Sequence, residues 1–377
     1  MRYYIIAGEA SGDLHGSNLM KGLLEYDPNA EFRFWGGDKM VDVAGEKALA
    51  MHYKKTSIMG FIEVLMNLRT IKGHMDFCKR DILEFKPDVI IHIDYPGFNL
   101  TMARFAKKHG IKTFYYIAPK VWAWKESRVK LLRRWVDKLF IIFPFEIEYF
   151  RKHGIEAFYA GNPLVDSIAQ RRSSIPSRSE FFTNNKLENK PTIALVAGSR
   201  ASEIKYNLPT MVEAARLMPE YQFVVAGVSW LDKDIYNKYL ANSNVKIITN
   251  QTYELLNHSH GALVTSGTAT LETALLGIPQ VVCYRFSAIS SAIARLVVKI
   301  KWVSLVNLVM NRSVVTELLL HHFTAQNAVD ELKAVIPSGE RHEKLIQDYN
   351  ELQQVIGSEG ASYRFAKEMV NLLNQKK

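Results

Sequence analysis

The stretch Y-Y-I-I-A-G-E-A-S-G-D-L-H-G, residues 3–16, joins an apolar run to a glycine-punctuated turn and then to a helical pattern. A strand, a turn and a helix in this order are typical of α/β proteins, which bind ligands at such turns. The glycines stand four residues apart, so the turn lacks the G-x-G-x-x-G of dinucleotide-binding folds. It also lacks the Gly-Lys-Ser/Thr of a P-loop and the G-x-S-x-G of a nucleophile elbow.

The same turn is acidic, because it carries Glu9 and Asp13 beside His15. Two carboxylates at the start of a helix repel a phosphate, but they suit sugar hydroxyls or the work of a general base. The alternative is structural, since Ser11 or Asp13 is a favourable N-cap for the helix without any ligand. The spacing alone leaves both interpretations open.

The chain has 377 residues, 48% of them hydrophobic, with a formal net charge of +10 and a pI of about 9.3. This length predicts two domains, and the charge predicts an acidic partner: nucleic acid, an anionic membrane or a phosphorylated substrate. Cys78 and Cys283 form no C-x-x-C, which argues against a disulfide framework or a zinc site and fits a reducing cytoplasm. We expect neither a signal peptide nor a transmembrane helix, because a strand begins at residue 2 and no run of 18 uncharged apolar residues occurs.

Apolar strand patterns alternate with amphipathic helical patterns along the whole chain. Strands are expected at residues 3–7, 31–35, 89–93, 113–117 and 139–143, and again at 192–196, 222–226, 245–248, 262–265 and 280–283. The polar stretch 171–180 separates the two sets. The pattern predicts an α/β fold of two Rossmann-like domains facing a cleft, with the chemistry in the loops that follow the strands. The expected domains are 1–170, completed by a C-terminal helix at 360–377, and 185–355.

Two turns of the second half are candidate phosphate sites. In A-L-V-A-G-S-R-A-S-E, residues 194–203, a strand leads into Gly198, Ser199 and Arg200 before a helix. In L-V-T-S-G-T-A-T-L-E-T-A-L, residues 263–275, Ser266, Gly267 and Thr268 open a helix, and Glu272 lies one turn further on. Helix N-termini bind anions, and a carboxylate one turn along can reach a ribose hydroxyl. Each turn alone is more often only a helix cap, but together they favour a nucleoside diphosphate.

Two apolar segments with basic residues favour contact with a membrane surface. Residues 58–68, I-M-G-F-I-E-V-L-M-N-L, lie between lysines and arginines, and residues 286–310 are interrupted by Arg295, Lys299 and Lys301. Such segments are either buried helices with snorkelling cations or interfacial helices that anionic lipid attracts. Two of them on a basic chain favour a peripheral membrane protein. The side chains assigned to this surface are Met59, Phe61, Ile62, Val64, Leu65, Leu68, Arg295 and Lys299.

A third candidate site follows the strand V-I-I-H-I, residues 89–93, where Asp94 precedes the Pro96-Gly97 turn. A carboxylate at the carboxyl end of a strand can serve as a general base for a hydroxyl. An Asp before Pro-Gly is equally well explained by turn chemistry. Downstream, Y-I-A-P-K-V-W-A-W-K, residues 116–125, offers tryptophans for a sugar ring, for a lipid interface or for plain core packing.

Together these motifs resemble those of the lipid-A-disaccharide synthase family. The resemblance covers residues 8 to about 330 and rests, in chain order, on G-E-A-S-G-D, I-M-G-F-I-E-V-L, H-I-D-Y-P-G-F-N-L, P-K-V-W-A-W, P-F-E, G-N-P-L, A-G-S-R-x-x-E-I and T-S-G-T-A-T-L-E-T. It implies a GT-B fold and an inverting, metal-independent glycosyl transfer that uses no cofactor. The implied donor is UDP-2,3-diacylglucosamine and the implied acceptor is 2,3-diacylglucosamine 1-phosphate, called lipid X. The products would be a β-1,6-linked tetraacyl disaccharide 1-phosphate and UDP, formed at the cytoplasmic face of the inner membrane.

The resemblance also implies roles for individual residues. Asp94 matches the family's candidate base, and Glu9 lies in the turn on the acceptor side. The matched donor-side positions are Ser199, Arg200, Ser266, Gly267, Thr268, Glu272, Asn307 and Gln326. Many members have a second Asp where this chain has Gly97, so the base cannot depend on a carboxylate there. Asp94 is then the main candidate, with Glu9 and Asp13 as rivals.

Other functions remain as alternatives. One is a different GT-B enzyme that uses UDP-N-acetylglucosamine, such as a lipid-linked transferase or a 2-epimerase, although an epimerase with a soluble substrate does not need so apolar a segment at 58–68. Another is a non-catalytic, membrane-associated binder of nucleotide sugars, which needs no carboxylate at Asp94. Nucleic acid is not an expected partner, because no motif combines cations with stacking aromatics. A homodimer remains open.

Overall fold

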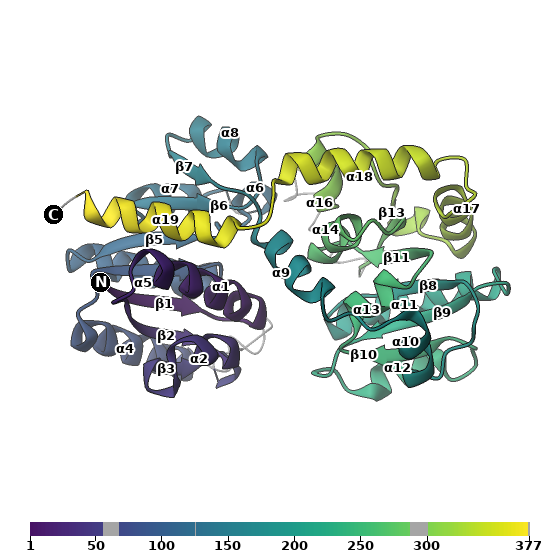
Figure 1. The fold of residues 1–377 in the computed structure, drawn as a ribbon, viewed down its shortest axis with the longest axis horizontal. Helices are drawn as coiled ribbons and strands as arrows, with labels where there is room; N and C mark the ends of the chain where they lie inside the picture. Colours follow the sequence, from purple (N-terminus) through teal and green to yellow (C-terminus); the bar gives the residue numbers. More distant parts are fainter. Residues whose placement is uncertain (56–67, 125, 287–300, 376–377) are drawn as a thin grey trace. The chain divides into compact units, whose positions relative to one another are not determined.

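Parallel strands alternate with helices in two units, which confirms the α/β fold of two Rossmann-like domains. A computed structural model describes residues 1–55, 68–124, 126–286 and 301–375. One unit comprises Met1–Asp166 and Gly357–Lys377, and the second comprises Ser167–Ile356. The division falls inside helix α9 (Pro163–Arg172), between Asp166 and Ser167 and therefore ahead of the polar stretch 171–180 (Figure 1).

The sheet of unit 1 is parallel throughout, with the strand order β3-β2-β1-β4-β5-β6-β7. The chain adds β2 and β3 on one side of β1 and then crosses to the other side, where β4 pairs with β1 so that Ile93 lies opposite Ala7. The order of strands therefore reverses between β1 and β4. The strands are β1 (Arg2–Ala7), β2 (Glu31–Gly36), β3 (Leu49–His52), β4 (Val89–Ile93), β5 (Lys112–Tyr116), β6 (Lys138–Ile141) and β7 (Ala157–Tyr159).

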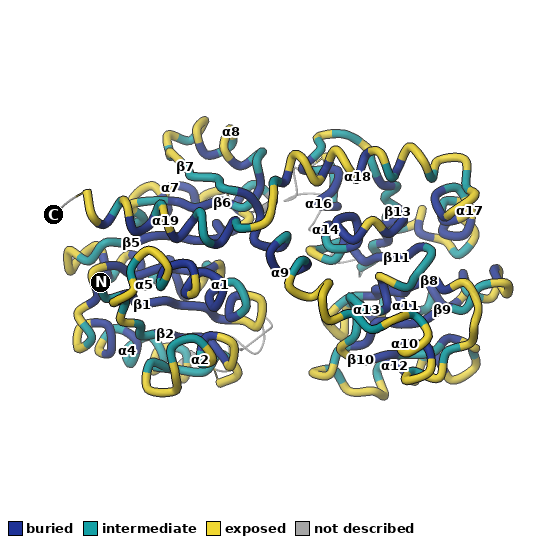
Figure 2. The backbone as a smooth tube through the Cα atoms, in the orientation of Figure 1, coloured by how far each residue is buried: buried dark blue, intermediate teal, exposed yellow. Residues whose placement is uncertain are grey.

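The sheet of unit 2 repeats this arrangement in the order β10-β9-β8-β11-β12-β13. Here β8 is the first strand of the unit, and the order reverses between β8 and β11. The strands are β8 (Thr192–Val196), β9 (Gln222–Gly227), β10 (Lys246–Thr249), β11 (Gly261–Thr265), β12 (Gln280–Tyr284) and β13 (Glu317–Leu319). Central strands such as β4, β8 and β11 are buried along their whole length (Figure 2), as their continuous apolar runs predict.

The sequence missed three strands, β3, β7 and β13, and each of them lies at an edge of its sheet. They have only three or four residues and are mostly half-buried, so they lack the apolar run that marks a central strand. The expected strand at 139–143 is displaced, because β6 ends at Ile141.

Helices cover both sheets. In unit 1 they are α1 (Ala10–Tyr26), α2 (Asp38–Ala44), α4 (Leu68–Phe85), α5 (Pro96–Lys108), α6 (Val121–Trp124), α7 (Arg128–Trp135), α8 (Phe145–Lys152), α9 and α19 (Ala361–Asn374), with short 3₁₀ turns at Glu46–Ala48 and Tyr53–Lys55. In unit 2 they are α10 (Arg178–Asn184), α11 (Ala201–Arg216), α12 (Lys233–Leu240), α13 (Thr252–Asn257), α14 (Thr268–Leu275), α16 (Leu305–Met310), α17 (Ala325–Val335) and α18 (His342–Ile356), with a 3₁₀ turn at Leu320–His322. In the described part of the chain, no helix is long and apolar enough to cross a membrane.

The last helix, α19, returns to the first unit and lies along α1 (Figure 1). The two helices approach closely because Gly22 has no side chain: a Cβ there would lie 2.9 Å from the Cβ of Ala366. Asp166 fixes the start of α19, since its carboxylate accepts hydrogen bonds from the backbone N–H groups of Gly360, Ala361 and Ser362 at 2.7–3.2 Å. Burial of Phe365, Met369 and similar residues against the sheet then anchors this terminal segment in unit 1.

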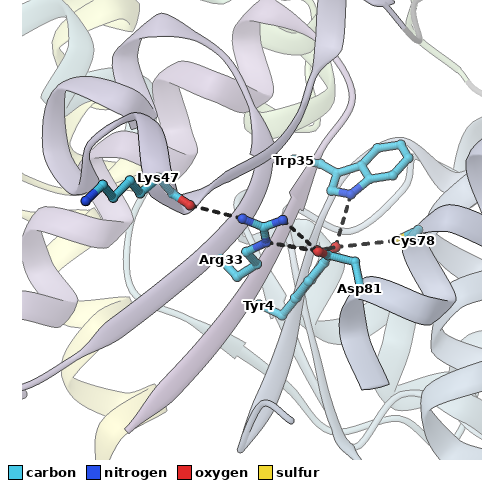
Figure 3. Close-up of polar contacts among 6 residues, drawn as sticks. All are labelled: Tyr4, Arg33, Trp35, Lys47, Cys78 and Asp81. Carbon is cyan, nitrogen blue, oxygen red and sulfur yellow. Dashed lines mark hydrogen bonds and ion pairs between the residues drawn. The ribbon is translucent and has the colours of Figure 1, made fainter. Parts of the chain in front are cut away.

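On the other face of the sheet, a polar network attaches α4 to β1 and β2 (Figure 3). The Arg33 guanidinium pairs with both oxygens of Asp81 at 2.7–3.1 Å, and the Tyr4 hydroxyl donates to Asp81 at 2.7 Å. Trp35 donates through Nε1 to the same hydroxyl at 3.1 Å. Burial raises the pKa of Tyr4 well above its ordinary value, so the phenol remains a donor. The two charged groups of this network, Arg33 and Asp81, are paired with each other. The network is therefore explained by its role in holding α4 on the sheet.

Candidate active site

In unit 1 the candidate residues Glu9 and Asp94 follow adjacent strands. Ala7 at the end of β1 lies opposite Ile93 at the end of β4, so the two loops leave the same edge of the sheet side by side. The order of strands reverses between these two strands. Open α/β sheets bind ligands outside the carboxyl ends of their strands at such a point. Both carboxylates are exposed there.

The backbone at Asp94 adopts an unusual conformation. Asp94 and Tyr95 have φ values of 42° and 45°, a left-handed region that non-glycine residues rarely adopt. The Asp94 carbonyl accepts hydrogen bonds from the Tyr115 hydroxyl at 2.6 Å and from Asn99 Nδ2 at 2.8 Å. Its N–H donates to the Tyr116 carbonyl at 3.3 Å. Strained backbone held by its surroundings in this way clusters at functional sites.

The side-chain amide of Asn99 is hydrogen-bonded to the backbone of this turn and of the strand before it. Its Nδ2 also lies 3.2 Å from the Ile93 carbonyl, and its Oδ1 lies 3.2 Å from Nδ1 of His92. Burial lowers the pKa of His92 to about 4, so the imidazole is neutral at physiological pH. Neither Asn99 nor Tyr115 was among the predicted site residues. Only Asn99 had a signal in the sequence, because it belongs to the motif H-I-D-Y-P-G-F-N-L.

Gly8 allows the first loop to approach the Asp94 turn. A Cβ on Gly8 would lie 2.4 Å from Cγ of Tyr95, well inside contact distance. The missing side chain therefore makes room for the Tyr95 ring, and the G-E-A-S-G-D turn packs directly on the Asp94 turn. This close approach gives the first glycine of that motif a physical reason.

The surroundings of Asp94 tune its carboxyl group. Asp94 is exposed as a whole residue, but the protein atoms around its carboxyl group disfavour the charged form and raise the pKa to about 6. Lys120 opposes this rise, and the negative charge of Glu9 adds to it. Asp94 is then mostly ionised at neutral pH with a pKa close to it, as a general base requires.

The carboxylate of Asp13, the third candidate, is bound by backbone N–H groups of another element. Its Oδ1 accepts hydrogen bonds from the N–H groups of Gly37 and Met40 at 2.7 and 3.1 Å, and its Oδ2 accepts one from Lys39 at 3.1 Å. The carboxylate is buried and caps helix α2 from a neighbouring element. The alternative in which Ser11 or Asp13 caps α1 does not apply, because Glu9 occupies that N-cap position and makes no side-chain cap hydrogen bond.

The P-K-V-W-A-W and P-F-E motifs meet each other in the structure. Trp122 Nε1 donates to Oε1 of Glu146 at 3.0 Å, and Oε2 accepts hydrogen bonds from the N–H groups of Ile142 and Phe143 at 3.3 and 3.1 Å. Burial raises the pKa of Glu146 to about 7, against the opposing effects of these donors and of Lys120. Of the interpretations left open for these tryptophans, packing applies to Trp122, whose ring also lies edge-on to Phe145.

In unit 2 the two candidate phosphate turns flank the reversal of strand order. The turn at Gly198–Arg200 follows β8, and Ser266–Thr268 follow β11, the strand that pairs with β8. Thr268 is exposed at the start of α14, while the Ser266 hydroxyl donates to the Val303 carbonyl at 2.7 Å. One turn along α14, burial raises the pKa of Glu272, against the opposing effects of Tyr253 and Arg171.

The turn at Gly198–Arg200 is hydrogen-bonded to Glu203 in the helix that follows it, α11. Oε2 of Glu203 accepts hydrogen bonds from the N–H groups of Ser199 and Arg200 at 2.9 and 3.2 Å, and Nη1 of Arg200 pairs with Oε1 at 3.2 Å. Gly198 adopts a φ of 120°, and a Cβ there would lie 2.5 Å from Glu203. A carboxylate of the chain thus occupies the place where the sequence predicted a phosphate, and Arg200 stays exposed beside it.

Asn307, one of the expected donor-side residues, uses its amide within the chain. It is fully buried, and Nδ2 donates to the Val315 carbonyl and to Glu317 Oε1, both at 2.9 Å. Its Oδ1 accepts from the N–H groups of Val314 and Val315 at 2.7 and 2.9 Å. All four hydrogen-bonding positions of the amide are used, so Asn307 organises this loop. Gln326 is exposed near the start of α17 and donates to Asp330 at 2.7 Å.

The membrane-facing assignments lie almost wholly outside the described residues. Leu68 begins α4. The others, which are Met59, Phe61, Ile62, Val64, Leu65, Arg295 and Lys299, belong to 56–67 and 287–300.

Comparison with known proteins identifies the family. A family model described as lipid-A-disaccharide synthetase matches residues 3–369. The lipid-A-disaccharide synthase of Syntrophus aciditrophicus is 35% identical, over 98% of this chain and 97% of its own length. The synthase of Coxiella burnetii (strain Dugway 5J108-111) is 33% identical, over 98% of both chains.

Solved structures resemble the fold at low sequence identity. A UDP-GlcNAc 2-epimerase from Neisseria meningitidis, bound to UDP-GlcNAc, superposes with a TM-score of 0.70 at 15% identity, over 98% of this chain and all of its own. A calicheamicin glycosyltransferase superposes with a TM-score of 0.58 at 15% identity, over all of this chain and 98% of its own. These likenesses show the GT-B fold, and the sequence relatives show the family. The chain therefore belongs to the lipid-A-disaccharide synthase family and is a glycosyltransferase of lipid A biosynthesis.

Proposed function

We propose that Asp94 is the general base of the family's transfer reaction. In that reaction 2,3-diacylglucosamine moves from its UDP donor to the 6-hydroxyl of 2,3-diacylglucosamine 1-phosphate. The single observation that carries the proposal is the Asp94 turn: an exposed carboxylate on a left-handed backbone, held by Tyr115 and Asn99 where the strand order reverses. Its pKa of about 6 suits proton removal at neutral pH.

The transfer is a single displacement with inversion. Asp94 takes the proton of the acceptor hydroxyl, and that oxygen forms a bond to the anomeric carbon of the donor. The bond from this carbon to the diphosphate breaks on the opposite side, and its electron pair leaves with UDP. Glu9, on the adjacent loop, is exposed and suits a hydroxyl of the acceptor sugar.

The groups proposed to hold the UDP belong to unit 2. Arg200, the turn at Ser266–Thr268 and the start of α14 offer positive charge and hydrogen-bond donors for the diphosphate, a role that usually contributes most to such catalysis. Glu272, one turn further, suits the ribose hydroxyls. Because Arg200 and the Ser199 N–H are bound to Glu203, a diphosphate at this turn has to compete with that carboxylate.

We also propose that the protein works at the cytoplasmic face of the inner membrane as a peripheral protein. The support is chemical: both proposed substrates carry acyl chains, the chain has a net charge of +10, and residues 58–68 are apolar between basic flanks.

The direct test is an assay of the purified protein in detergent with the UDP donor, lipid X and a chelator. Release of UDP together with a disaccharide 1-phosphate, identified by mass spectrometry, is the expected result. UDP binding without any disaccharide product would contradict the acceptor assignment and leave the donor assignment intact. Product that disappears with the chelator would contradict a metal-independent reaction.

A further inference from the structure

A pocket of about 520 Å³ lies between α7 and α8 of unit 1, and neither the family resemblance nor the proposed reaction uses it. Its volume falls within the range of about 300–1,000 Å³ that is usual for ligand sites. It is lined by Glu126, Ser127, Val129, Lys130, Arg133, Lys152, His153 and Gly154.

The pocket is basic. Three cations, Lys130, Arg133 and Lys152, line it together with one carboxylate, that of Glu126. Glu126 is occupied by His153 at 3.4 Å. Lys152 lies 3.8 Å from Glu148, which also pairs with Arg151.

Two of these cations are free. Lys130 and Arg133 are exposed, and neither forms a hydrogen bond or an ion pair with any residue of the described ranges. Positive charge in the last turn of a helix is favourable by itself, which accounts for Arg133 in α7 and for Lys152 in α8. It does not account for Lys130, which lies earlier in α7, a helix with four cations and no acidic residue. A pocket lined by two cations without partners in the described ranges favours the binding of an anion.

We propose that this pocket binds a phosphate group. Arg133 presents a planar fork that matches two phosphate oxygens, and Lys130 adds a second positive charge on the same helix. The Ser127 hydroxyl, which also lines the pocket, is a further donor. The phosphate can belong to the headgroup of an anionic lipid or to a soluble compound, and the chemistry of recognition is the same for both. The inference is independent of the transfer reaction, since it uses none of the residues assigned to it.

The test uses the full chain and a double variant, Lys130→Gln with Arg133→Gln. The matched control is Lys108→Gln with Arg134→Gln, which removes one lysine and one arginine from exposed positions of the same unit outside the pocket. Circular dichroism and thermal unfolding check that each variant is folded. One arm measures sedimentation with vesicles of phosphatidylcholine, with and without one quarter phosphatidylglycerol. The other measures titration with inorganic phosphate in lipid-free buffer.

The pocket variant is expected to bind phosphatidylglycerol vesicles at least about tenfold more weakly than the unmodified protein, because each cation at an anionic surface contributes appreciably. The control is expected to lose less than about threefold. A loss confined to the vesicle arm identifies a lipid headgroup, and a loss confined to the phosphate arm identifies a soluble phosphate. If the pocket variant matches its control in both arms, the proposal is wrong, because net charge alone then explains any binding. Neither arm contains the transferase substrates, so the outcome is separate from that of the transferase assay.

Discussion

The carboxyl edges of the two sheets are built on the same strand order but present their charges differently. At the edge of unit 1, Asp94 and Glu9 are exposed and form no ion pair within the described ranges, and the backbone of Asp94 is fixed by Tyr115 and Asn99. At the edge of unit 2, Arg200 pairs with Glu203, whose carboxylate also accepts hydrogen bonds from the N–H groups of the same turn. The same strand order thus presents carboxylates without an ion pair in the described part of unit 1, and an arginine already paired with a carboxylate of the chain in unit 2. In the proposed reaction, the first suits proton transfer, and the second has to exchange partners when the diphosphate binds.

The largest expected effect comes from removing the carboxylate of Asp94 in unit 1. Asp94→Asn keeps the shape of the side chain but cannot accept the proton, so we expect kcat to fall by about 10²–10⁴-fold. The Kd for UDP, measured by titration calorimetry, should stay near that of the unmodified protein because the UDP groups belong to unit 2. Normal turnover in this variant would remove Asp94 from the role and make Glu9→Gln the next variant to measure.

In unit 2 the ion pair of Arg200 predicts an effect on UDP affinity. Arg200→Gln should weaken UDP binding by about 10- to 100-fold, the usual worth of a hydrogen bond to a charged group. Lys205→Gln removes an exposed cation from the same helix and serves as the control. Equal affinities in the two variants would show that the Arg200–Glu203 pair is only a helix cap.

Within the first turn, Asp13 differs from the exposed Glu9 because its carboxylate is buried and bound by backbone N–H groups. Asp13→Asn replaces one accepting oxygen with a donor that faces backbone N–H groups, so we expect a loss of about 1–3 kcal/mol in the free energy of unfolding. Asp42→Asn, an exposed position on the helix that Asp13 caps, should change it little. Denaturant unfolding measures both. A stable Asp13→Asn protein with impaired turnover would instead return Asp13 to the list of candidate bases.

The smallest expected effect is a pair of opposite shifts in the pH profile of kcat/KM. The base must be ionised, so activity should be lost as the pH falls through the Asp94 pKa of about 6. Glu9 raises that pKa and Lys120 lowers it. Glu9→Gln should therefore move the acid limb to lower pH, and Lys120→Gln should move it to higher pH. Shifts in the same direction would mean that another group controls the limb.

Much of the fold was predictable because long apolar runs have few alternatives. Strand β8 was predicted at its observed bounds, and the strands β9, β10, β11 and β12 of the same sheet were predicted to within one residue at each end. Of the four edge strands in the described ranges, β10 was predicted from its apolar run, whereas β3, β7 and β13 were missed, since so short a strand depends on a partner supplied by the sheet. The place of Asp94 after a buried strand was also predictable, whereas its left-handed backbone was not, because Tyr115 and Asn99 impose it from other elements.

The amino-acid sequence was sufficient to predict the alternation of strands and helices, the motifs of the family and the residue types at each strand end. These are local properties, set by hydrophobic period, glycine spacing and the chemistry of single side chains. Which polar side chains stay available to a ligand depends on the tertiary structure: Asp94 and Glu9 stay exposed, whereas Asp13 is bound by backbone N–H groups at the start of α2. The reason is that a buried polar group must find a partner, and that partner is fixed by packing between segments far apart in sequence.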